Sequence, residues 1–164
     1  MLQTRYGYTS QRNVPGGLAD SSPNNEIVSR ANAETDSTAI HFGMGVVRGD
    51  IAGENIKLPV AASTAALFEG VVLTTQMELG VEGEQRNPGT RMLNVLESGK
   101  AWVLIPEGLE VAYGDPVHLI KDGADAGRFT KTSGTNAIAL KGRFIGKADS
   151  GDIAPIHLYN VSHA

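Results

Sequence analysis

The 164-residue sequence lacks features that several classes of protein require. It has no cysteine, which excludes disulfide frameworks, thiol nucleophiles and thiolate metal cages. Lys and Arg number 14 against 18 Asp and Glu, so the net charge is −4, and the basic surplus that favours phosphate-backbone binding is missing. No apolar run approaches the roughly 20 residues that cross a bilayer, and the first residues carry no secretory signal. We therefore expect no direct nucleic-acid partner, no membrane span and no export by a signal of its own.

Large side chains are also scarce, whereas glycine is abundant. Aromatic residues make up 5% of the chain, with a single tryptophan at position 102, and 20 of the 164 residues are glycine. The glycine content is well above the usual share of about 7%. This composition indicates a turn-rich protein, predominantly of β structure.

The chain changes character near residue 38. Residues 1–38 contain five Val, Ile, Leu or Phe, whereas the remaining 126 residues contain 35. The first part is rich in Pro, Gly, Ser, Asn and Asp, which supply turns and solvated backbone and cannot bury enough apolar area to offset the entropy of ordering. We predict an extended N-terminal arm at 1–38 and a β-barrel domain at 39–164. A frayed terminus without a role is the alternative for the arm.

From residue 39 onward, short apolar segments alternate with glycine-bearing turns, a pattern typical of an all-β barrel or sandwich. The predicted strands lie at 40–47, 70–75, 92–96, 101–105, 116–120, 128–130, 142–148 and 153–159. We predict a hairpin of 92–96 with 101–105, turning at Gly99 with positive φ, and a second pairing of 116–120 with 128–130. Residues 62–68 have helical composition but are long enough for only one or two helical turns. We predict a long exposed loop at 77–91, which carries Glu78, Glu82 and Glu84.

The motifs that could carry chemistry are all weak. Asp149-Ser150-Gly151 matches the short signature of an aspartic-protease loop, but no second such loop is present, and a plain turn is the better interpretation. The acids between Asp122 and Gly127 resemble a calcium loop with the wrong ligand spacing, which favours a hairpin turn. We therefore expect no enzyme activity and no cofactor.

The four histidines, at 41, 118, 157 and 163, have no i,i+4 or His-x-His spacing. Three of them lie in predicted strands and could converge only in space. The sequence therefore predicts no metal site.

A series of short motifs runs along the chain in a fixed order. The arm carries a Gly-Leu-Ala-Asp step (17–20) and the stretch Ile27–Ala31. The domain then carries, in this order, K-L-P (57–59), F-E-G-V-V-L (68–73), A-W-V (101–103), Y-G-D-P-V-H (113–118) and the closing run 144–158. Taken in this order, these individually modest motifs resemble the head decoration or structural cement proteins of tailed bacteriophages, and the likeness spans most of the chain.

This resemblance implies an all-β fold: a small β-barrel of short antiparallel strands, β-clip or β-tulip like, preceded by the extended arm. It further implies a homotrimer on the outer surface of the virion capsid, made in the host cytoplasm, that binds the major capsid protein. Such a protein cements neighbouring capsomers and so stabilises the head against the pressure of packaged DNA.

Within the arm, we predict that spaced apolar and aromatic side chains bind the capsid. These are Tyr6, Tyr8, Val14, Leu18, Ile27 and Val28. The acidic loop at 77–91 could face a basic capsid patch or be a solvated tip. Eight residues of the domain are assigned to core or subunit packing: Val71, Val95, Trp102, Leu104, Val117, Phe144, Ile145 and Ile156. Two alternatives remain at this point: a tail, fibre or other virion β-domain, and a small carbohydrate-binding β-barrel module.

Overall fold

A computed structural model describes residues 13–20, 23–36, 38–74, 92–149 and 151–159. In these ranges it contains nine strands and one short 3-10 helix, η1 (Ala65–Leu67). The strands are β1 (Glu26–Asn32), β2 (Gly45–Arg48), β3 (Asn55–Lys57), β4 (Phe68–Leu73), β5 (Met92–Leu104), β6 (Pro116–Ile120), β7 (Phe129–Thr130), β8 (Ala137–Phe144) and β9 (Ile153–Leu158). The predicted all-β class is confirmed.

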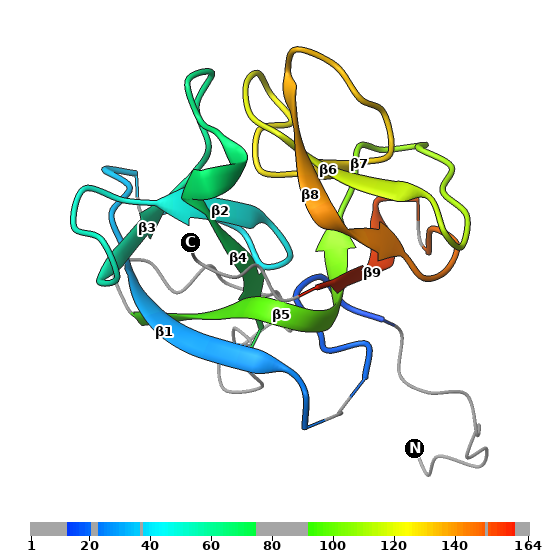
Figure 1. The fold of residues 1–164 in the computed structure, drawn as a ribbon, viewed down its shortest axis with the longest axis horizontal. Helices are drawn as coiled ribbons and strands as arrows, with labels where there is room; N and C mark the ends of the chain where they lie inside the picture. Colours follow the sequence, from blue (N-terminus) through cyan, green and yellow to red (C-terminus); the bar gives the residue numbers. More distant parts are fainter. Residues whose placement is uncertain (1–12, 21–22, 37, 75–91, 150, 160–164) are drawn as a thin grey trace, which may run out of the picture.

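Five of the strands close into a barrel, visible on the left of Figure 1. Going round the barrel, the order is β1, β3, β2, β4 and β5, and β5 pairs with β1 to complete the ring. All pairings are antiparallel except β1 with β3, which is parallel. Closure pairs each barrel strand with a neighbour on both sides over at least part of its length.

A second sheet grows from the far half of β5, in the order β5, β9, β8, β6 and β7 (Figure 1). Residues 92–98 of β5 pair with β1 and 94–96 also with β4, whereas residues 99–104 pair with β9. The strand bends between its two halves at Gly99, where φ is +130°. One strand therefore joins the barrel to the second sheet.

The predicted hairpin at 92–105 is wrong, although the positive φ at Gly99 is confirmed. The Glu-Ser-Gly-Lys sequence has turn composition, but in the structure the two apolar stretches run on along β5 because each finds a different partner. The second pairing, of β6 with β7, is confirmed, and η1 supplies the single helical turn expected within 62–68.

Three strand segments carried too little signal to be predicted: β1, β3 and the first part of β8. β1 falls inside the predicted arm, yet all seven of its residues belong to the barrel wall. The arm boundary at residue 38 stays a prediction from composition, and the structure adds that residues 26–32 of that arm form a barrel strand.

The interior is filled by two main apolar clusters and a third, minor one of Met44, Leu104 and Ile153. The larger lies between the barrel and the second sheet and includes Phe68, Leu119, Phe129, Phe144 and Ile156. The smaller fills the barrel with Ile40, Phe42, Val46, Ile56, Val72, Leu93 and Val95. Of the eight residues predicted to pack, six are buried, and Trp102 and Ile145 are half-buried.

Candidate functional site

The N-terminal segment Asn13–Asp20 lies along the edge of β5 that β9 leaves free. Backbone hydrogen bonds join Gly16 N to Trp102 O (2.7 Å), Trp102 N to Gly17 O (2.8 Å) and Ala19 N to Lys100 O (3.0 Å). Gly16 has φ +75°, and a Cβ there would lie 2.8 Å from the backbone of both Val72 and Thr74. Only glycine fits this slot, so the segment is anchored by backbone geometry as well as by hydrogen bonds.

This anchoring leaves two of the predicted capsid-binding residues on the surface. Val14 and Leu18 are 41% and 43% exposed beside the strand that holds Trp102. Ile27, on β1, is also exposed, whereas Val28 packs against the barrel core. Tyr6 and Tyr8 lie outside the described residues. Three of the four described positions are therefore exposed and one packs inward, and the role of all six in binding stays a prediction.

The acidic residues predicted to face a basic partner, Glu78, Glu82 and Glu84, also lie outside the described residues. A different charged cluster occupies one mouth of the barrel. Glu69 is 6% exposed and lies between Arg48 (3.2 Å) and Arg30 (3.8 Å), and Arg30 also contacts Glu97 (3.3 Å). Two arginines and two glutamates compensate one another, so we assign this cluster to barrel structure rather than to chemistry.

Sequence reasoning missed a basic surface on the outer side of the second sheet. Lys100 of β5 is directly opposite His157 of β9, which in turn is opposite Arg143 of β8. Lys141 and Tyr159 continue the same surface at alternate positions of their strands, and Arg143 stacks on the Tyr113 ring at 4.9 Å. We call these six residues the basic–aromatic face: Lys100, Tyr113, Lys141, Arg143, His157 and Tyr159. The i,i+2 alternation of Lys141 with Arg143 and of His157 with Tyr159 was the only signal in the sequence.

A groove of about 550 Å³ borders this face, between the bend of β5, residues 23–26 and the end of β9. Inside it, the His157 and Tyr159 rings meet edge to face with their centroids 4.9 Å apart. Burial, followed by the charges of Lys100 and Arg143, holds the pKa of His157 below its ordinary value of 6.5. The imidazole is therefore held in its neutral form near pH 7.

This depressed pKa has a consequence for stability. Above pH 6.5, His157 is neutral in both the folded and the unfolded chain and contributes nothing to the pH dependence. Near and below pH 6.5, His157 binds a proton more readily in the unfolded chain than in the folded one, so the free energy of unfolding decreases as the pH is lowered. We expect urea unfolding of the wild type between about pH 7.5 and pH 5 to lose more stability than that of His157→Gln. Parallel curves for the two proteins would contradict this interpretation.

The weak motifs of the sequence turn out to be turns. Asp149 pairs with Ile153 in the tight connection between β8 and β9. Asp122 and Asp125 lie in the loop between β6 and β7, where Asp125 is ion-paired with Arg128 at 3.4 Å. Within the described ranges, no three His, Asp or Glu side chains converge as a metal site would require, and no helix is long and apolar enough to cross a membrane.

Comparison with known proteins points in one direction. No curated protein sequence matches the chain. A solved structure, "The capsid of Myoviridae Phage XM1", contains a chain that matches with a TM-score of 0.62 at 20% identity, covering 96% of each chain. At this identity the likeness establishes a shared fold only.

The model of one protein family matches residues 2–159, which is nearly the whole chain. That family is described as "Structural cement protein (E217 gp24/Pam3 gp6)". The match covers the N-terminal segment, the barrel and the second sheet together. The chain therefore belongs to the structural cement protein family of phages and is a capsid-stabilising structural protein of the virion.

Proposed function

We propose that this protein binds the outer surface of the capsid lattice as a homotrimer, contacts the major capsid protein and cements neighbouring capsomers. The observation that carries the proposal is the family match over residues 2–159. The role is structural rather than enzymatic, and it opposes the outward pressure of packaged DNA.

The architecture supports this role in two ways. Ring closure joins β1 to β5 and so removes those two strand edges from strand addition where they pair, which favours binding through side-chain surfaces and the N-terminal arm. A three-fold ring would present three such surfaces at once, and simultaneous contacts turn individually weak contacts into tight attachment.

The arm is the second element of the proposal. Val14 and Leu18 are exposed on a segment that Gly16 and three backbone hydrogen bonds hold against β5. Together with Tyr6, Tyr8, Ile27 and Val28, they are the residues we propose to contact the capsid. Because segment 13–20 is anchored on β5, force applied through residues 1–12 would be transmitted to the barrel without detaching that segment.

The experiment is light scattering on the purified protein, followed by co-sedimentation with expanded, undecorated heads of its phage. We expect a mass of about 52 kDa, three times the 17.3 kDa of the chain, and saturable binding to heads. Heads that bind the protein should also resist a higher temperature before releasing DNA. A protein that stays in the supernatant at every concentration would overturn the proposal.

A further inference from the structure

The basic–aromatic face has an arrangement of charge that the fold does not need. Lys100, His157 and Arg143 stand side by side on three neighbouring strands, in direct cross-strand register. Burial, and then the charges of Lys100 and Arg143, lower the pKa of His157, so two cations flank a neutral imidazole. Neither Lys100 nor Arg143 faces an acid across the strands, since each lies opposite His157.

The acids of the described chain neutralise this face only in part. Lys100 is ion-paired with Asp20 at 3.0 Å, and Glu26, in the neighbouring groove, accepts a hydrogen bond from Ser98 Oγ. Arg143 and Lys141 make no ion pair with any residue that the structure describes. A positive surface therefore stands on a chain whose net charge is −4.

Exposed aromatic rings frame the same charges. Tyr113, beneath Arg143, is 66% exposed, and Tyr159, against His157, is 42% exposed. Tyrosine and arginine are enriched where proteins bind proteins, because they combine contact area with hydrogen-bonding groups. The groove of about 550 Å³ beside His157 has room for side chains of a bound segment.

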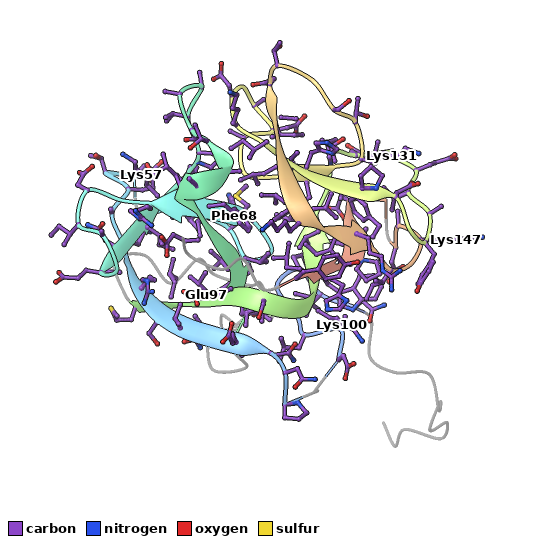
Figure 2. All side chains as sticks on the ribbon, in the orientation of Figure 1. Lys57, Phe68, Glu97, Lys100, Lys131 and Lys147 are labelled. Carbon is purple, nitrogen blue, oxygen red and sulfur yellow. The ribbon has the colours of Figure 1, made fainter. Side chains whose placement is uncertain are left out.

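The face also adjoins the base of the arm. The strand residues Lys100 and Trp102 accept backbone hydrogen bonds from Ala19 and Gly16. Figure 2 shows Lys100 near the bend of β5, where the strand passes from the barrel to the second sheet. A capsid surface that binds the arm would therefore also lie close to the basic–aromatic face.

We propose that the basic–aromatic face binds an acidic segment of the capsid surface, an extended peptide whose carboxylates meet Lys100, Lys141 and Arg143 and whose apolar groups meet the two tyrosines. This inference rests on the proposed function and names the partner chemistry of one surface within it. Charge complementarity favours an acidic partner, because Lys141 and Arg143 make no ion pair with any residue that the structure describes and can attract its carboxylates. The same overall charge opposes a nucleic acid, whose backbone needs a broad positive footprint.

The chain offers a closely matched pair of variants for the test. Lys100 and Lys57 are 36% and 37% exposed, and each has one ion pair, with Asp20 and Asp50 respectively. Figure 2 shows Lys57 at the upper left, on the barrel, and Lys100 at the lower edge right of centre, where the second sheet begins. Lys100→Glu should weaken sedimentation with heads by about tenfold or more, whereas Lys57→Glu should stay within about twofold of wild type. Lys141→Glu should repeat the loss without disturbing the Asp20 ion pair, and raising salt should weaken the wild type.

A second measurement does not depend on heads. Trp102 is the only tryptophan and is half-buried on the same strand as Lys100, so its fluorescence reports on the face. Titration with a short polyglutamate peptide should change this fluorescence in the wild type and in Lys57→Glu, and should fail to do so in Lys100→Glu. In the same titration, oligothymidylate should bind the wild type more weakly than polyglutamate does.

Each outcome decides between the proposals. If all variants bind heads equally, the face is not the capsid contact, although the proposed function stands. If Lys100→Glu or Lys141→Glu lowers the mass in light scattering, the face joins copies of this chain instead. Oligothymidylate binding as tight as polyglutamate would assign it to nucleic acid. If the wild type does not bind heads, the proposed function fails. A fluorescence response to polyglutamate would then still support a site for acidic segments, whereas no response would overturn that inference as well.

Discussion

Replacing Gly70 with alanine is expected to lower the free energy of unfolding by about 3 kcal/mol or more, the largest single-residue effect we predict. Gly70 lies in β4, between β2 and β5 in the barrel wall, with φ at +146°. A Cβ there would overlap the carbonyl oxygen of Leu96 in the neighbouring strand and lie 2.8 Å from Val95 Cγ1. The obstacle is backbone, so it cannot rotate away, and the strands themselves have to separate.

The matched control is Gly53→Ala. Gly53 also has positive φ, at +80°, but a Cβ there would meet nothing within 4 Å. This variant carries the conformational cost alone, about 1 kcal/mol. Urea unfolding followed by circular dichroism and by Trp102 fluorescence measures both variants. Equal losses at the two positions would show that the close approach of β4 to β5 does not limit the barrel.

Deleting residues 1–12 is expected to weaken binding to heads by about tenfold or more while leaving the domain folded. The remaining chain starts at Asn13 and keeps Gly16 in its slot, with the backbone hydrogen bonds to Lys100 and Trp102 intact. Its unfolding midpoint should therefore stay close to that of the full chain. The proposed contacts of Tyr6 and Tyr8 would be gone, and co-sedimentation with undecorated heads measures the loss.

The position of the cut decides what this experiment tests. A deletion of residues 1–38, as the composition alone suggests, would also remove β1, which pairs with β5 over residues 26–31 and with β3. The barrel would then be open and its core, including Val95 and Leu93, exposed. That longer deletion should fail to fold cooperatively, and it serves as the control for loss of the domain. Full decoration by the 1–12 deletion would contradict a capsid-binding role for those residues.

Much of this protein was determined by local features of its sequence. Alternating or continuous short apolar runs between glycines specify strands, because a strand needs only a face to bury and a turn to end it. The β6–β7 pairing and the short helical turn η1 follow from the same local rules. The order of modest motifs along the chain was enough to indicate the family.

The tertiary structure decided which strands pair. Residues 92–104 contain turn-forming residues and still make one strand, because their two halves meet different partners: β1 and β4 on one side of the bend, β9 on the other. β1 has little apolar character and becomes a strand because it closes the ring. Hydrogen bonds to a distant partner outweigh weak local preference in both cases.

The basic–aromatic face is also a product of the tertiary structure. Lys100, Arg143 and His157 are far apart or separated by a turn in the sequence and come into one row only through the register of β5, β9 and β8. Local sequence determines which face of each strand a side chain takes, since successive residues alternate. Which faces then lie side by side depends on strand order, a property of the whole chain that no single segment carries.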